Sequence, residues 1–479
     1  MDSFDLVIRN GTVCTAADVT PCDVGITGGK IVALGTNLPA GREEIDAKGL
    51  LVLPGGIDSH VHLAQPSGEG IVMADDFETG TASAACGGNT TILPFALQER
   101  GQSLRAAVQD YHRVSDGNCY VDYSFHMIIS DANESVLGQE LPALVRDGYT
   151  SFKIFMTYDD LKLNDREILE VLAVARDEGA LVMVHAESHD AIKFMTEKLE
   201  AAGRTEPRGH ALSRPAVVER EATHRAISFA ELVDVPIMIV HVSGREPMEQ
   251  IRWAQQRNLK IYGETCPQYL VLTEDDLDGI GFEGAKYVCS PPPRDAASQD
   301  ACWEGIEQGI FQVFSSDHCP FRFEGDDGKQ RHGSRSNFRW VPNGIPGVET
   351  RLPILFSEGV SKGRIDICRF VALTATNHAR TYGLYPRKGT IAVGSDADIV
   401  LWDPARKEVI RQEILHHGCD YTPYEGFEVV GWPVLTMVRG TVVARDGKLV
   451  GTRGFGEYLR RDLSPLAKPR KAPDAQMAN

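Results

Sequence analysis

Eight apolar, strand-like runs between residues 56 and 316 constrain the fold more than any other feature of the sequence. Most are separated by longer segments in which apolar residues recur at helical spacing, such as 165–178 and 248–257. Strands that alternate with amphipathic helices are typical of parallel sheets, and eight such units predict an α/β fold, a (β/α)8 TIM-like barrel. An open, doubly wound sheet is the alternative. The runs are 56–62, 90–95, 121–129, 151–156, 181–185, 236–241, 260–264 and 311–316.

Polar side chains gather where these runs end. His60 and His62 close the first run, and because side chains alternate along a strand, both rings project from one face. Neutral imidazole is a common metal ligand, although two surface histidines on a sheet edge would show the same spacing. Catalytic groups of parallel barrels lie at the C-terminal mouth, so the whole series favours a metal site there. The later runs contribute Lys153, His185, His241 and Asp317.

The two ends of the chain share a different pattern. Short alternating strands with glycine turns fill the first 53 residues, and residues 437–443 echo residues 8–13. We therefore expect both ends to build one small β-sandwich domain that brackets the barrel. The predicted division is 1–53 and 375–460 for this domain, 54–374 for the barrel, and 461–479 for a C-terminal tail without a packing pattern.

Charge and cysteine usage exclude several classes of function. The chain has 479 residues, with 49 Lys and Arg against 67 Asp and Glu, which gives a net charge of −18. So acidic a protein is a poor partner for nucleic acid or an anionic membrane. The ten cysteines show no Cys-x-x-Cys spacing, the start lacks a signal peptide, and no apolar run reaches membrane-spanning length. We expect a cytoplasmic protein.

An ordered set of motifs resembles the cyclic amidohydrolases of the dihydropyrimidinase and hydantoinase group. The resemblance extends from about residue 5 to residue 460. The motifs that carry it are PGGIDSHVH at 54–62, SFKIFMTY at 151–158, VHAE at 184–187, IVHVS at 239–243, ETCPQYL at 264–270, SPP at 290–292, SDH at 316–318, NGIPGVE at 343–349 and GSDADIV at 394–400.

This resemblance implies a hydrolase that opens a hydantoin or dihydropyrimidine ring, an imide or ureide, to an N-carbamoyl amino acid. It implies two divalent ions per subunit, most often zinc with manganese or cobalt as substitutes, which share an attacking hydroxide. A protonated lysine has no lone pair for a metal, whereas its CO2 adduct offers two anionic oxygens. The implied ligands are His60, His62 and Asp317 for one ion, His185 and His241 for the other, and a bridging carboxylated Lys153 (N6-carboxylysine).

The resemblance also implies roles in catalysis and substrate binding. Asp317 would take a proton from the attacking hydroxide and deliver it to the leaving nitrogen. Tyr158 would donate its phenol proton to the developing oxyanion. The main chains at Ser290 and Asn343 would hold the amide edge of the ring. Small-molecule substrates and a homo-oligomer, a tetramer or a dimer, are the partners that it implies.

Departures from the family pattern bear on the substrate. Ala64 stands where dihydroorotases have an arginine for the substrate carboxylate, which argues against that activity. An allantoinase-like ureide hydrolase would use the same centre and stays an alternative. Ser67 is small where many relatives have Phe, so we expect a pocket that accepts larger or more polar 5-substituents. A non-catalytic scaffold, like the collapsin response mediator proteins, is the alternative of a different class, although such proteins lack several ligands present here.

Overall fold

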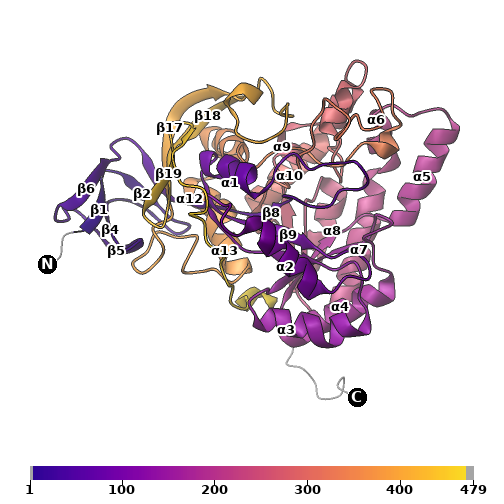
Figure 1. Ribbon diagram of the computed structural model, residues 1–479, viewed down its shortest axis with the longest axis horizontal. Coiled ribbons are helices and arrows are strands. Elements are labelled where there is room, and N and C mark those ends of the chain that lie inside the picture. The colour runs from indigo at the N-terminus through magenta and orange to yellow at the C-terminus, as the bar shows by residue number, and fades with distance from the viewer. Residues whose placement is uncertain (1–3, 471–479) are drawn as a thin grey trace.

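The structure is a computed structural model that describes residues 4–470. Figure 1 shows a large body in which helices surround a group of strands, with smaller β-sheets packed against one side. The N-terminal strands and the strands after residue 398 lie together in those smaller sheets. The predicted bracketing of a central body by the two chain ends is therefore visible in the arrangement.

The central body is a near-closed barrel of parallel strands, which confirms the predicted fold class. Each of the eight predicted runs forms a strand, and the third is split in two. Neighbouring strands pair in parallel around the barrel. They are β8 (Gly56–Val61), β9 (Asn89–Leu97), β10 (Asp122–Tyr123), β11 (His126–Ile128), β12 (Ser151–Phe155), β13 (Leu181–His185), β14 (Ile237–Ile239), β15 (Ile261–Thr265) and β16 (Val313–Phe314).

The barrel closes between its first and last strands by a seam of isolated contacts. A single parallel bridge joins Val61 to His318, and the backbone N–H of His62 donates to the carbonyl of His318 at 2.7 Å. The Asp58 carboxylate accepts from the backbone N–H of His60 and from that of Ser316, each at 3.2 Å. Side chains and single backbone bonds therefore hold the seam that carries the first and last polar groups of the series.

Helix α4 (Asp165–Glu178) shows why the intervening segments fold as they do. Asn164 and Glu167 form a capping box at its start, and Gly179 ends it at φ 71°, a left-handed conformation that glycine adopts without strain. Its apolar residues recur at helical spacing and are buried against the barrel. The other α-helices are α1 (Phe77–Cys86), α2 (Leu104–Ser115), α3 (Leu141–Arg146), α5 (His189–Ala201), α6 (Arg208–Ser213), α7 (Ala216–Val233), α8 (Arg245–Gln256), α9 (Gln268–Val271), α10 (Ala296–Gln308), α11 (Arg351–Leu355), α12 (Ile367–Val371) and α13 (Asn377–Thr381).

Two further sheets come from the chain ends. One has the order β5-β4-β1-β6, from strands Lys30–Gly35, Asp23–Thr27, Phe4–Arg9 and Gly41–Asp46. The other has the order β20-β19-β18-β17-β7-β2-β3, from Lys448–Leu449, Thr441–Arg445, Glu428–Val438, Ile399–Val409, Leu51–Pro54, Thr12–Cys14 and Val19–Pro21. The antiparallel pair of β7 and β17 joins the N- and C-terminal segments directly. One apolar core lies between the sheets and includes Ile8, Val52 and Met437. The predicted domain limits themselves stay a prediction.

The beginning of the predicted C-terminal tail packs against the barrel. Arg461 is 2% exposed and donates to the hydroxyls of Ser124 and Ser151 at 2.9 and 2.8 Å. Ala467 is buried in a core shared with barrel residues, and the Lys260 ammonium donates to the carbonyl of Lys468. The segment up to residue 470 is therefore docked, and residues 471–479 lie outside the described part of the chain. Among residues 4–470, no helix has the length and apolarity needed to cross a membrane.

Candidate metal centre

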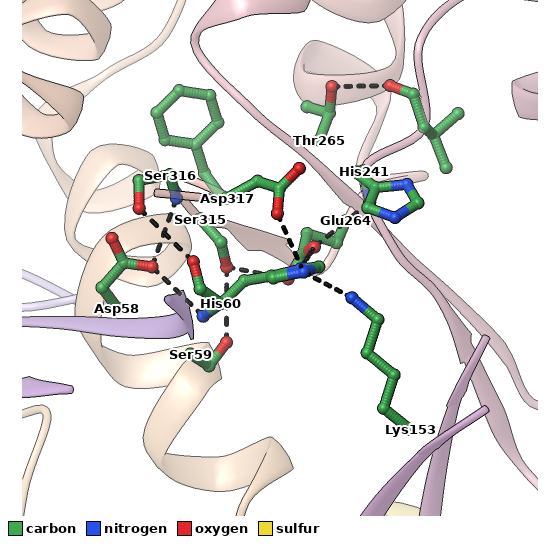
Figure 2. A network of polar contacts seen from close by, with 12 residues as sticks. Asp58, Ser59, His60, Lys153, His241, Glu264, Thr265, Ser315, Ser316 and Asp317 are labelled. Carbon is green, nitrogen blue, oxygen red and sulfur yellow. Dashed lines mark hydrogen bonds and ion pairs between the residues drawn. The ribbon is translucent and has the colours of Figure 1, made fainter. Parts of the chain in front are cut away.

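The predicted ligands meet at the C-terminal mouth of the barrel. Figure 2 shows Lys153, Glu264 and Asp317 gathered around His60. The Nε2 atom of His60 lies 2.6 Å from the Lys153 ammonium and 3.1 Å from Oδ1 of Asp317. The same Asp317 oxygen lies 3.4 Å from Nε2 of His62. The chain thus brings together residues from β8, β12 and the end of β16, which are up to 257 positions apart.

The remaining two histidines lie beside this group. The ring centroids of His60 and His241 are 5.4 Å apart, and those of His185 and His241 are 4.5 Å apart. These two histidines come from the ends of β13 and β14, two neighbouring barrel strands. All six predicted ligands are buried, with none more than 8% exposed. The structure therefore places every predicted ligand in one cluster.

Three of the histidines are oriented by outer hydrogen bonds. Nδ1 of His60 lies 2.6 Å from Glu264, and Nδ1 of His62 lies 2.7 Å from the Gln65 side-chain oxygen. Nε2 of His185 lies 2.8 Å from Glu187. Each ring that donates one N–H outward keeps the lone pair of its other nitrogen available, as metal-binding histidines do. These partners are arranged as ligand-orienting groups.

His241 provides the strongest sign that the cluster is built for cations. Both of its ring nitrogens are buried and have no hydrogen-bond partner within residues 4–470. Buried polar atoms without partners are costly, so the ring nitrogens need a ligand. Burial lowers the pKa of His241 and of His60 well below the usual histidine range, which keeps the imidazoles neutral and able to coordinate. Four imidazoles, one carboxylate and an amine that can be carboxylated fit divalent ions of the zinc type.

Lys153 has an environment suited to carboxylation. Its side chain is 1% exposed, and its ammonium lies 4.5 Å from the centre of the Phe95 ring and 5.1 Å from that of Phe155. Burial lowers the pKa of Lys153, although the nearby Asp317 opposes this shift. A lower pKa enlarges the neutral amine fraction, and only the neutral amine adds CO2. The surroundings of Lys153 thus favour the form that a bridging ligand requires.

Asp317 and Tyr158 have protonation states that match their predicted roles. Burial alone would raise the pKa of Asp317, but the adjacent His60 and His62 rings outweigh it and lower the pKa to about 2. Asp317 is therefore ionised at neutral pH, as a proton acceptor must be. Burial raises the pKa of Tyr158 to about 12, so its hydroxyl keeps its proton and can donate it. The Tyr158 hydroxyl accepts a hydrogen bond of 3.3 Å from the side-chain amide of Asn343.

A cavity of about 840 Å³ opens onto this cluster. It is lined by five of the six predicted ligands, all except His60, by Tyr158, and by Ser290 and Asn343, the two predicted substrate-binding positions. The segment that follows His62 and the loop after β9 also border it, through Ser67 and Arg100 among others. This volume suits a small ring with a sizeable substituent.

Glu264, Glu187 and Gln65 contact the clustered histidines but have no predicted role from the sequence. The Glu264 carboxylate accepts from the backbone N–H of His241 at 3.1 Å and from the Ser315 hydroxyl at 2.8 Å, in addition to its contact with His60. Two positions in the sequence could have indicated these carboxylates. Glu264 lies near the end of strand β15, and Glu187 follows His185 by two residues. Gln65 follows His62 in an irregular loop, where no spacing rule applies.

Comparisons with known proteins agree on one family. The model of the Amidohydrolase family matches residues 51–443. A D-hydantoinase of Geobacillus stearothermophilus is 46% identical over 458 residues, which cover 95% of this chain and 96% of that protein. A D-phenylhydantoinase of Escherichia coli O1:K1 / APEC is 41% identical, and the match covers 97% of this chain and 99% of that protein. The crystal structure of dihydropyrimidinase from Brevibacillus agri NCHU1002 superposes with a TM-score of 0.93 at 45% identity, over 97% of this chain and 99% of that one.

Proposed function

Because this chain belongs to the amidohydrolase family, we propose that it is a cyclic amide hydrolase that opens hydantoin or dihydropyrimidine rings. The product of either ring is an N-carbamoyl amino acid. The observation that carries the proposal is the buried cluster of His60, Lys153, His241 and Asp317 at the mouth of the barrel. His62 and His185 complete the set of ligands that the family chemistry requires.

The donor atoms suggest how two divalent ions would be held. We assign His60, His62 and Asp317 to one ion, His185 and His241 to the other, and a carboxylated Lys153 to both. Zinc is the first candidate, and manganese or cobalt suits the same nitrogen and oxygen donors. When bound, such ions polarise the ring carbonyl and lower the pKa of the attacking water.

Asp317 moves the proton in the proposed reaction. Water adds through its oxygen to the carbonyl carbon of the ring, and the ionised Asp317 carboxylate takes one of its protons. When the carbon–nitrogen bond breaks, the electron pair goes to the ring nitrogen, and Asp317 delivers the same proton there. The carboxylate returns to its starting state, and the two steps sum to hydrolysis of one amide bond.

Tyr158 and the two substrate loops hold the ring. The Tyr158 hydroxyl donates to the carbonyl oxygen as negative charge develops on it, which stabilises the transition state more than the ground state. The main chains at Ser290 and Asn343 border the same cavity and would bind the amide edge of the ring. The bond from Asn343 to the Tyr158 hydroxyl couples one of these loops to the proton donor.

An allantoinase-like activity is the second candidate, because another ureide ring needs the same centre. The observation in its favour is the roomy cavity, which is bordered by polar groups such as Ser67 and Arg100. A non-catalytic scaffold is less consistent with a cluster that retains all six ligands, Tyr158 and a buried lysine. We also propose a homo-oligomer, a tetramer or a dimer, in the cytoplasm.

The test is turnover of dihydrouracil, hydantoin, 5-alkyl and 5-aryl hydantoins, allantoin and dihydroorotate by the purified protein. Metal content is measured beside activity, and about two ions per chain are expected. Lys153→Ala should lose both most of the bound metal and more than about a thousandfold in kcat/KM. A Lys153→Ala variant with full activity and both ions would refute the mechanism. Absence of turnover on every ring, with both ions bound, would refute the function.

A further inference from the structure

Lys329 is a buried lysine outside the metal centre. It lies in the irregular segment between β16 and the 3-10 turn Phe338–Trp340, and its side chain is 1% exposed. Within residues 4–470, its ammonium forms no ion pair with a carboxylate, and the acidic groups nearest to it are the thiols of Cys289, Cys319 and Cys419. Burial lowers the pKa of Lys329 to about 8. A buried ammonium without a counter-ion is expensive, so its retention needs compensation from specific hydrogen bonds.

Those hydrogen bonds go to two separate stretches of main chain. The Lys329 ammonium donates to the carbonyl of Val288 at 2.9 Å and to the carbonyl of Pro342 at 3.0 Å. Val288 precedes Ser290 by two residues, and Pro342 immediately precedes Asn343. One cation therefore ties together the two main chains on which substrate binding is proposed.

Other contacts leave this cross-link little freedom. The backbone N–H of Gly344 also donates to the Val288 carbonyl, at 3.0 Å, so both loops converge on that oxygen. The backbone N–H of Lys329 donates to the Arg322 carbonyl at 2.8 Å, which fixes the base of the lysine. A Cβ at Gly328 would meet that same Arg322 carbonyl at 2.1 Å, so the turn before Lys329 is tightly packed as well.

We propose that Lys329 is a positioning residue that sets the separation between the main chains at Ser290 and Asn343, and so the fit of the substrate's amide edge. This inference rests on the proposed function. A ring amide presents its N–H and carbonyl groups at a fixed spacing. The main chains at Ser290 and Asn343 that bind these groups must therefore be held at a matching distance from each other. Small displacements of such groups cost much of their binding energy.

The test compares Lys329→Met with wild type on dihydrouracil and hydantoin. Met is unbranched and only one atom shorter than Lys, so it fills most of the same space, and it removes both hydrogen bonds without leaving a buried charge. Because these main chains bind the edge of the ring in the ground state and the transition state alike, KM should rise about tenfold while kcat changes less than about threefold. Metal content should stay at the wild-type value. The matched control is Lys286→Met, since that ammonium pairs with Glu283 at 2.6 Å on a neighbouring turn.

A purely structural role gives a different result. Loss of folded enzyme would lower the apparent kcat and metal content together and leave KM unchanged, which would overturn the inference. So would a KM within twofold of wild type. If Lys329→Met does not fold, Lys329→Gln is tested instead. Because Gln retains an N–H donor, its KM should rise only about threefold. A wild-type protein that opens none of the rings would refute the proposed function, and this inference with it.

Discussion

Replacement of Glu264 by Gln should weaken one of the two metal ions selectively. The carboxylate is fully buried and lies 2.6 Å from Nδ1 of His60. A buried hydrogen bond to an ionised acceptor contributes about 1.5–3 kcal/mol, and one to a neutral acceptor about 0.5–1.5 kcal/mol. Burial raises the pKa of Glu264 to about 7, so the comparison applies above that pH, where the carboxylate is ionised. Gln keeps the shape and the contact but lacks the negative charge, so the difference between the two kinds of hydrogen bond is about 1.3 kcal/mol. That equals about tenfold in the dissociation constant of the ion that His60 binds.

The corresponding variant for the other ion is Glu187→Gln. Glu187 is fully buried and lies 2.8 Å from Nε2 of His185, so Glu187→Gln should weaken the ion bound by His185 by a similar factor. Chelator competition monitored by metal analysis gives the two dissociation constants for each variant. Glu200→Gln is the control, because that carboxylate accepts from Asn337 at 2.8 Å outside the centre. If both central variants weakened the same ion, or if neither weakened any, the assignment of these partners would be wrong.

Three further results are expected. Tyr158→Phe should lower kcat about a hundredfold or more with little change in KM, as measured by steady-state kinetics, because only the transition state gains from its donor; an unchanged kcat would exclude this role. Burial would raise the pKa of Asp396, but Lys388 outweighs it and lowers the pKa to about 2, so stability present above about pH 4 should be lost as the pH falls toward 2. In urea unfolding measured at several pH values, Asp396→Asn should reduce the loss of unfolding free energy between about pH 4 and pH 2. An unchanged loss over that range would contradict the assignment. Ser67→Phe should reduce kcat/KM for 5-aryl hydantoins more than for hydantoin, and equal losses would show that Ser67 does not shape the pocket.

The sequence predicted the barrel, and the six residues that the structure brings together at its mouth, because both depend on local patterns. Strand runs are visible in the period of apolar residues, and a ligand at a strand end needs only its position in that run. The third strand was predicted as one run but is broken between Tyr123 and His126, where the docked C-terminal segment binds its backbone. That contact is made by residues more than 330 positions away. No local pattern records such a contact.

The orienting groups of the centre could not be assigned a role for the same reason. Glu264 bonds to His60, which lies 204 positions earlier in the chain, and its side chain has no neighbour in sequence that reveals this. Lys329 likewise follows a stretch of glycine and charged residues that is typical of an exposed loop. Its burial arises from the approach of the Val288 and Pro342 main chains. Long-range packing decides both cases.

The seam between β8 and β16 has a consequence for how the protein assembles. His60 and His62 lie on one side of it and Asp317 on the other, so the ion that they would share spans the junction of the first and last barrel strands. Contacts between residues so distant in sequence form slowly, because the intervening chain must be ordered first. We therefore expect loading of this ion to follow barrel closure in refolding. Without the ion, amides at the seam should exchange with solvent sooner than those of β12 and β13, whose parallel ladder is continuous.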